Sequence, residues 1–274
     1  MKHFRGAVLI LFFMAVFALA MPAFAAHTPL VADGSDIEAE LSSLGLRLVL
    51  MTLAGVFVLL LASMAIHKPT ELLKRSLFWG ITIAVVTTTF VLIFFSVTLN
   101  TNSWSKGPIH WHADYQVYAC GQQLDLVDPV GLGNKIGTPS RHEHNDNRLH
   151  YEGVVLSSGN AKLGSFMEVL GAELTNDSLV FPTNTETVHY HTGDTCSDGT
   201  VGEVQVFLYR VGAGNVYTQT KLEHPEDYII RSESAVPPGD CLVIEFGAPK
   251  EMTDHICRSY EVADQIGKIR KATQ

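Results

Sequence analysis

The sequence predicts an α+β protein in which two N-terminal transmembrane helices precede an extracytoplasmic domain with a mixed β-sheet and one or two packed helices. Two uncharged apolar runs, 48–66 and 77–99, are each long enough to cross about 30 Å of hydrocarbon. Beyond them, polar and apolar residues alternate with the period of two that is typical of strands. The simplest layering is one twisted sheet with a helix on one face, and a β-grasp-like arrangement would fit it.

The first 25 residues have the pattern of a signal peptide. A positively charged start precedes the apolar stretch 6–20, and Ala-Phe-Ala at 23–25 is a small-x-small cleavage site. An uncleaved first membrane helix is the alternative. In either case we expect residues 26–47 to form an extracytoplasmic segment ahead of the first span.

The distribution of charge predicts the orientation of the two spans. The short loop 67–76 carries three Lys or Arg against one Glu, which marks it as cytoplasmic by the positive-inside rule. We therefore expect a multi-pass protein of the cell (cytoplasmic) membrane, with a linker at 100–108 and the domain 109–274 on the extracytoplasmic side. Neither span contains a charged residue, so the pair is typical of an anchor in the lipid bilayer and not of a transport path.

The domain that follows the spans is acidic. Residues 101–274 contain 13 Lys and Arg against 23 Asp and Glu, a net charge of −10. This excludes nucleic acid as a partner, because nucleic-acid binding depends on neutralising phosphates with cations. It suits cationic partners, metal ions included. Only Met167 and Met252 fall in this region, which argues against a thioether-rich site for Cu(I).

Alternation and turn residues place the elements of the domain. Strands are predicted at 109–119, 123–127, 148–156, 187–191, 203–211, 215–219 and 241–246. Apolar residues at helical spacing predict a short helix over 163–170, which Gly171 ends. Pro249 is well placed to begin a final helix that runs to about Ile266. The Gly- and Pro-rich stretch 128–140 predicts a loop.

Histidines recur in three His-x-His pairs, and this pattern is the clearest indication of a functional site in the sequence. A strand points residues i and i+2 to the same face, so each pair presents two imidazoles about 6–7 Å apart at Cα. Neutral imidazole is a usual ligand for Zn and Cu(II), and we expect such a site to use at least two of the three stretches. The candidate metal ligands are His110, His112, His142, His144, His150, His189 and His191, with Asp114 and Glu152 as further ligands or as partners that orient an imidazole.

Two other interpretations of the histidines stay open. They could form a hydrogen-bonded network without an ion, or a pH-responsive cluster, because histidine titrates near neutrality. The segment Asn145-Asp146-Asn147 predicts a turn that swings His150 back toward His142 and His144, although a plain tight loop is equally compatible with its composition.

The domain contains four cysteines, an even number that suggests two disulfides in an oxidising compartment. Three connectivities are possible. We favour Cys241 with Cys257, which would join the last strand to the last helix, and Cys120 with Cys196. There is no C-x-x-C motif, so a thioredoxin-like redox site is unsupported.

Catalytic motifs are absent from the sequence. It has no G-x-S-x-G, no H-E-x-x-H and no phosphate-binding glycine loop. Glu143 or Glu152 could act as a general base beside a metal-bound water. Spacing alone does not distinguish that arrangement from a plain binding site, so the sequence leaves enzymatic activity undecided.

Several motifs resemble those of an uncharacterised group of prokaryotic membrane-anchored extracytoplasmic proteins. These are His-Trp-His-Ala-Asp at 110–114, the H-x-H-N-D-N-x-x-H-x-E-G segment within 141–153, and the L-G-x-F helix at 163–171. Residues 239–241 and 253–260 are also similar to that group. The resemblance implies that the two spans and the histidine-bearing domain work as one unit. It implies no catalytic role.

These features lead to an expected function. We expect a membrane-anchored, extracytoplasmic protein that binds Zn or Cu(II) and serves in metal capture, delivery or sensing. We expect the pairs at 110–112 and 142–144, together with His150, to supply the main metal ligands, and we treat the pair at 189–191 as an optional source of ligands. A metal-dependent enzyme, either a hydrolase or a copper oxidase, is one alternative. The other is an interaction module whose spans assemble with another membrane protein.

Overall fold

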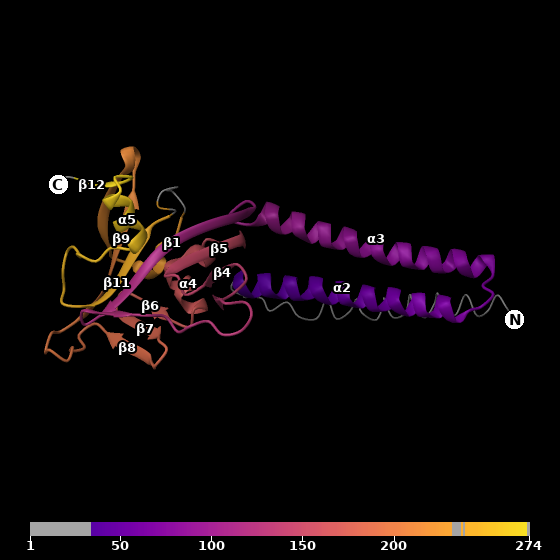
Figure 1. Ribbon diagram of the computed structural model, residues 1–274, viewed down its shortest axis with the longest axis horizontal. Helices are drawn as coiled ribbons and strands as arrows, with labels where there is room; N and C mark the ends of the chain where they lie inside the picture. The colour runs from indigo at the N-terminus through magenta and orange to yellow at the C-terminus, as the bar shows by residue number, and fades with distance from the viewer. Residues whose placement is uncertain (1–33, 232–236, 238, 273–274) are drawn as a thin grey trace. The chain divides into compact units, whose positions relative to one another are not determined.

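The computed structural model describes residues 34–231, 237 and 239–272. The predicted signal peptide, residues 1–25, lies outside them. The chain divides into two compact units, Met1–Thr101 and Asn102–Gln274. The first unit contains two long apolar helices and the second a mixed sheet (Figure 1), so the predicted α+β class is confirmed at this level.

Two helices, α2 (Gly34–Ala65) and α3 (Glu71–Asn102), form the described part of the first unit. They lie side by side (Figure 1), and the hydroxyls of Thr52 and Thr88 share a hydrogen bond of 2.7 Å. Both helices are long and apolar enough to cross a membrane, judged by length and composition. Helix α2 begins well before residue 48, and the preceding stretch contains the strong helix formers Glu-Ala-Glu-Leu at 38–41.

The second unit is built on a nine-stranded sheet and a separate three-stranded sheet (Figure 1). The order in the large sheet is β12-β10-β9-β11-β1-β5-β4-β3, with β2 paired to β1 outside this path. Its strands are β1 (Pro108–Ala119), β2 (Gln122–Leu124), β3 (Ile136–Gly137), β4 (Arg141–Glu143), β5 (Arg148–Val154), β9 (Glu203–Val211), β10 (Val216–Leu222), β11 (Cys241–Gly247) and β12 (Arg270–Lys271). The small sheet contains β6 (Glu173–Leu174), β7 (Ser178–Pro182) and β8 (Thr187–His191). The helices are α4 (Leu163–Val169) and α5 (Arg258–Gln265), with 3-10 turns at Gly159–Ala161, Ala213–Asn215 and Pro225–Asp227.

Strand β1 lies near the centre of the large sheet and has two different faces. It pairs in parallel with β11 and antiparallel with β5, which makes the sheet mixed. Trp111, Ala113 and Tyr115 pack in or against the main hydrophobic core on one face. His110 and His112 alternate with them and therefore point to the other face. The predicted period-two pattern of this strand is confirmed.

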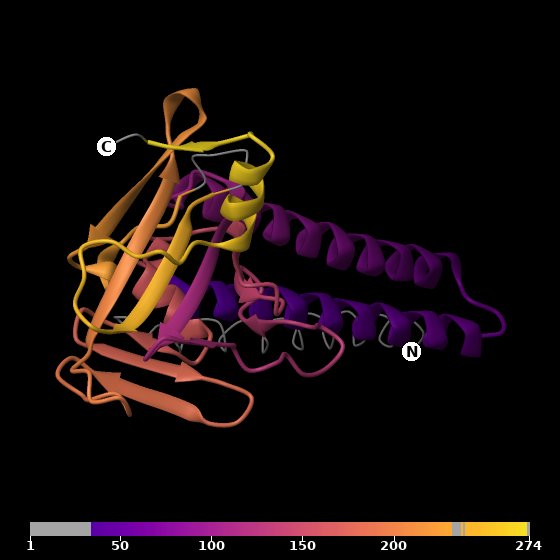
Figure 2. The ribbon, with the colours of Figure 1, turned by 60° about the vertical axis from the view of Figure 1, so that its left-hand side comes forward.

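Each face of the large sheet is covered by one helix, whereas the sequence predicted one covered face. Helix α4 places Phe166 in the main core together with Leu242 of β11. Helix α5, yellow in Figure 2, places Tyr260 in a second core with Val243. Strand β11 is buried at every residue except Gly247. Its continuous apolar run is typical of a strand that is buried on both faces, and α5 provides the cover for the second face.

The segment predicted as a linker, 100–108, is partly structured. Helix α3 continues to Asn102, and Trp104 already packs against the main core. The backbone N–H of Trp104 donates to the carbonyl of Leu156 at 3.1 Å, and its ring lies edge-on to Trp111 with 6.1 Å between centroids. The domain therefore begins a few residues before the predicted boundary.

The predicted final helix from Pro249 to Ile266 is too long, because α5 begins only at Arg258. The preceding loop is held in a non-helical path by a buried carboxylate. Thr253 donates from its hydroxyl to Glu245, whose carboxylate also lies 2.9 Å from Nδ1 of His255. These interactions compete with helix formation through the 250–257 segment, and the chain becomes helical only after them.

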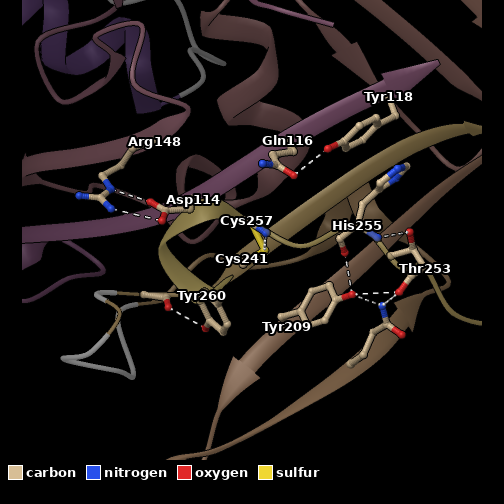
Figure 3. The surroundings of a disulfide bond; sticks show 12 residues. Asp114, Gln116, Tyr118, Arg148, Tyr209, Cys241, Thr253, His255, Cys257 and Tyr260 are labelled. Carbon is tan, nitrogen blue, oxygen red and sulfur yellow. Dashed lines mark hydrogen bonds and ion pairs between the residues drawn. A yellow bond between two sulfur atoms is a disulfide. The ribbon is translucent and has the colours of Figure 1, made fainter. Parts of the chain in front are cut away.

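Both disulfides that the sequence favoured are present. Cys120 joins Cys196, which closes 76 residues, and Cys241 joins Cys257, which closes 16. The second bond links β11 to the start of α5 (Figure 3). In the loop-entropy description each closure stabilises the fold by about 3–5 kcal/mol, the longer loop more than the shorter one.

Glu245 makes the stability of the domain sensitive to acid. Burial alone would raise the pKa of its carboxyl, but hydrogen bonds from Lys250, Thr253 and His255 outweigh burial and hold the pKa below its usual value. A carboxylate with a lowered folded-state pKa stabilises the fold above its unfolded-state pKa, and this contribution disappears as the pH falls through the folded-state value. Glu245→Gln should therefore destabilise the metal-free chain by about 1–3 kcal/mol at neutral pH.

Urea unfolding at several pH values would measure this effect. The difference between the wild type and Glu245→Gln should shrink as the pH falls below about 4. Glu251→Gln, an exposed change on the same loop, is the matched control and should be nearly silent. A difference between Glu245→Gln and the wild type that is constant from pH 7 to pH 3 would contradict the prediction.

Candidate metal centre

Five histidines meet on one face of the sheet where β1, β5 and β4 run side by side. In the strand register, His112 is opposite His150, and His150 is opposite His142. His110 is opposite Glu152 in the same pairing of β1 with β5. Residues directly opposite each other lie about 4.5–5.5 Å apart at Cβ, so three separate stretches of sequence deliver their side chains to one patch. We refer to His110, His112, His142, His144 and His150 as the histidine face.

The imidazole rings of the histidine face are in contact with one another. Ring centroids are 4.6 Å apart for His110 and His112, and 4.8 Å apart for His112 and His150. His142 lies parallel to His150 at 5.5 Å. His144 is edge-on to both, at 4.7 Å from His142 and 5.1 Å from His150. His150 therefore connects the first two His-x-His pairs.

His142, His150 and Glu152 form a group that could hold a metal ion. One donor atom from each of the three residues lies within 4.8 Å of the other two. The carboxylate of Glu152 lies between strands, with Oε1 3.7 Å from Nε2 of His110 and Oε2 3.9 Å from Nε2 of His142. Two imidazoles and a carboxylate are a common set of protein ligands for zinc.

His142 is the most buried member of the histidine face, with 2% of its surface exposed. Its Nδ1 is buried and has no hydrogen-bond partner among the residues that the structure describes. Burial, and after it the charge of the neighbouring His144, lowers the pKa of the His142 imidazole. A neutral ring with an unpartnered nitrogen has the form that a metal ligand requires.

The neutral form is also favoured for His112. Burial lowers the pKa of its imidazole, and the nearby rings of His150 and His110 lower it further. Its Nε2 lies 3.0 Å from Nε2 of His110. In the neutral tautomers one of these nitrogens donates and the other accepts, and a metal ion would use the lone pairs of both.

Two members of the histidine face have partners that orient their rings. Nδ1 of His144 lies 2.6 Å from the carbonyl oxygen of Asn134, and Nε2 of His150 lies 3.3 Å from a carboxylate oxygen of Asp146. A hydrogen bond from one ring nitrogen leaves the other nitrogen with the lone pair, which is the usual arrangement behind a metal-ligating histidine. The sequence did not identify either partner. Asp146 lies four residues before His150 across a predicted turn, and this spacing could have identified it as a partner. Nothing in the sequence indicates that Asn134 lies beside His144.

The predicted turn at 145–147 is confirmed, and Glu143 stabilises it. Asn145 and Asn147 have positive φ angles, which asparagine adopts more readily than most residues. The Glu143 carboxylate accepts hydrogen bonds from the backbone N–H groups of Asn145, Asp146 and Asn147. Glu143 alternates with His142 on β4 and points away from the histidine face. This position makes Glu143 a turn-stabilising residue, and of the two predicted general bases only Glu152 lies beside the imidazoles.

Asp114 continues the His110–His112 side of β1 but is engaged elsewhere (Figure 3). Its carboxylate accepts from Nε of Arg148 at 2.6 Å and from Nη2 of Arg148 at 3.2 Å. This bidentate ion pair engages both oxygens of Asp114, and the side chain is buried. The structure does not place Asp114 in the metal-ligand group, where the sequence had it as a candidate.

The third His-x-His pair, His189 and His191, lies on β8 in the small sheet, apart from the histidine face. Its strand pairs only with β7. Cys196, which follows β8, is bonded to Cys120 at the far end of β1 from His110. Both histidines are exposed, and no ring contact or ion pair in the described part of the chain connects them to the histidine face.

A cavity of about 590 Å³ borders the histidine face on the side of α5. Asp146 lines this cavity and also contacts His150, so one side chain belongs to both. Arg148 and Arg258 bring positive charge to its walls, and Val262 and Ile266 bring apolar surface. Asp114 and Asp146 also line the cavity, and Arg148 is already paired with Asp114, so its walls carry both signs of charge.

No protein-family model, curated protein or solved structure matches the chain. The resemblance to the group of membrane-anchored proteins therefore stays a prediction from the motifs.

Proposed function

We propose that the protein is a membrane-anchored, extracytoplasmic metal-binding protein. The observation that supports it best is the group formed by His142, His150 and Glu152, surrounded by three further imidazoles. Burial that lowers the pKa of His142 and His112 favours the uncharged rings that bind metal.

The donor types favour Zn or Cu(II). Imidazole and carboxylate suit both ions, and no thiol or thioether belongs to the histidine face. All four cysteines are in disulfides, so no thiolate competes for the metal. We propose metal capture, delivery or sensing as the work of the site.

We also propose that α2 and α3 cross the membrane, with the loop 67–76 on the cytoplasmic side and the domain outside the cytoplasm. Large apolar side chains such as Phe57, Phe90 and Phe94 are exposed on these helices, which suits contact with lipid. The two disulfides suit an oxidising compartment. The β-grasp-like description of the sheet and assembly with another membrane protein remain predictions of the sequence.

A metal-dependent enzyme is the second candidate function. It is favoured by the cavity that shares Asp146 with the histidine face. A group of three protein ligands leaves a coordination position for water or substrate, as in catalytic zinc sites. If Glu152 stays unbound beside an ion held by His142 and His150, it is the residue placed to accept a proton from a metal-bound water.

Elemental analysis of the full chain, purified in mild detergent, tests the proposed function. We expect at least about one zinc or copper ion per chain, removal of the ion by a chelator, and a lower melting temperature after removal. Absence of bound metal, together with unfolding that a chelator and added zinc or copper leave unchanged, would overturn the proposal. Hydrolysis assays on simple esters and phosphate esters, with and without the metal, then address the enzymatic alternative.

A further inference from the structure

The histidine face offers more donors than one ion can use. Five imidazoles and one carboxylate lie in a continuous set of contacts. A four-coordinate ion such as zinc takes four ligands and often only three from the protein. Two or more donors would therefore be left over if a single ion occupied the face.

The two oxygens of Glu152 point to histidines on different strands. Oε1 is nearest to His110 on β1, and Oε2 is nearest to His142 on β4. Strand β5, which carries Glu152, lies between β1 and β4 in the sheet. Neighbouring strands are about 4.8 Å apart, so β1 and β4 are separated by about twice that distance. A carboxylate at this central position is placed to share its oxygens between two ions.

The donors divide into two groups around that carboxylate. On the β4 side, donor atoms of His142, His150 and Glu152 lie within 4.8 Å of one another. On the β1 side, the Nε2 atoms of His110 and His112 are 3.0 Å apart, and Oε1 of Glu152 is 3.7 Å from Nε2 of His110. Two ligands of one tetrahedral zinc ion, bound at about 2.0–2.1 Å, are separated by about 3.3 Å. The His110–His112 and His110–Glu152 distances on the β1 side lie on either side of that value, and on the β4 side Oε2 of Glu152 is 3.9 Å from Nε2 of His142.

We propose that the histidine face holds a pair of divalent ions bridged by the carboxylate of Glu152. One ion is bound by His142 and His150, and the other by His110 and His112. This inference rests on the proposed function and extends it from a single ion to a dinuclear centre. In two-metal sites the ions lie about 3.5–4 Å apart.

Copper(II) loading of the full chain in detergent tests the pair. Bound copper is counted by elemental analysis after the excess is removed, and electron paramagnetic resonance reports whether the copper ions are magnetically coupled. We expect two copper ions per wild-type chain, with a resonance intensity well below that of the same amount of isolated copper(II). The His110→Ala/His112→Ala variant should retain one copper ion per chain, with the full intensity of an isolated ion.

Two further variants complete the experiment. Glu152→Gln should restore the isolated-copper spectrum, because an amide does not bridge two ions as a carboxylate does. His189→Ala/His191→Ala changes an equivalent pair outside the histidine face and should keep both the copper count and the coupling. His110 is exposed, so its replacement leaves the core unchanged, and a melting curve of each metal-free variant checks its fold.

The possible failures are distinct. One copper ion per wild-type chain, unchanged by His110→Ala/His112→Ala, would overturn the dinuclear centre and leave the proposed metal site intact. Coupling that persists in Glu152→Gln would overturn the bridging role of that residue. No bound copper or zinc in the wild type would overturn the proposed function itself.

Discussion

Replacing His142 and His150 with glutamine is expected to weaken zinc or copper binding at the His142–His150–Glu152 group by about 100-fold or more, since losing even an outer partner of a metal ligand costs 10–100-fold. Both residues belong to the three-residue group whose donor atoms converge. Glutamine keeps a polar side chain of similar length but lacks the ring nitrogen that binds these ions. Metal affinity is measured by competition with a chelating dye, on the full chain in detergent.

The matched control for this variant is His189→Gln/His191→Gln. It makes the same pair of changes in the exposed His-x-His of β8, which pairs only with β7 in the small sheet. Its affinity should equal that of the wild type. Equal losses in both variants would mean that metal is held nonspecifically by surface histidines, and a loss only in the β8 variant would move the site to the small sheet.

Gly239→Ala is expected to destabilise the domain by about 3 kcal/mol or more, because it combines backbone strain with a backbone clash. Gly239 has a φ of +82°, and a Cβ at this position would lie 1.7 Å from the carbonyl oxygen of His112. This contact is with backbone and not with a flexible side chain, so β1 or the segment before β11 must move. For a chain of this size we expect a fall of about 6–12 °C in the melting temperature.

Gly239→Ala should weaken metal binding as well as lower the stability of the fold. Gly239 precedes β11 and abuts the backbone of His112, so a displacement of β1 would move the His112 ring. We therefore expect weaker metal binding in the fraction that remains folded. Gly247→Ala is the control at the other end of β11, because a Cβ there meets nothing within 4 Å and the glycine has no positive φ. Similar melting temperatures for the two variants would refute the close approach of Gly239 to His112.

Much of the domain could be predicted from the sequence where local pattern decides the structure. The alternation in β1, the hairpin of β9 with β10 and the helix ended by Gly171 follow from side-chain periodicity and turn residues. The final helix could not be predicted in the same way. Pro249 is a favourable first residue for a helix, but the hydrogen bonds to the buried Glu245 determine the path of the chain through Thr253 and His255.

In the candidate site, too, the local pattern could be predicted and the contacts between distant segments could not. Side-chain alternation placed His110 with His112 on one face and His150 with Glu152 on one face, and the turn at 145–147 brought β5 back beside β4. Alternation could not show that the carboxylate of Asp114 is occupied by Arg148 while that of Glu152 lies among the imidazoles. That difference depends on which strand lies opposite, and therefore on the register.

By itself the sequence determined the two apolar helices, the acidic domain after them and the spacing that gives each His-x-His pair a common face. These properties are local, because they depend on the length of an apolar run or on the period of a strand. Only the tertiary structure decided that two of the three pairs share a sheet and that His189 and His191 lie on another. The physical reason is that a metal site needs donors within a few ångströms, and that proximity comes from the pairing of β1, β5 and β4, which no single segment encodes.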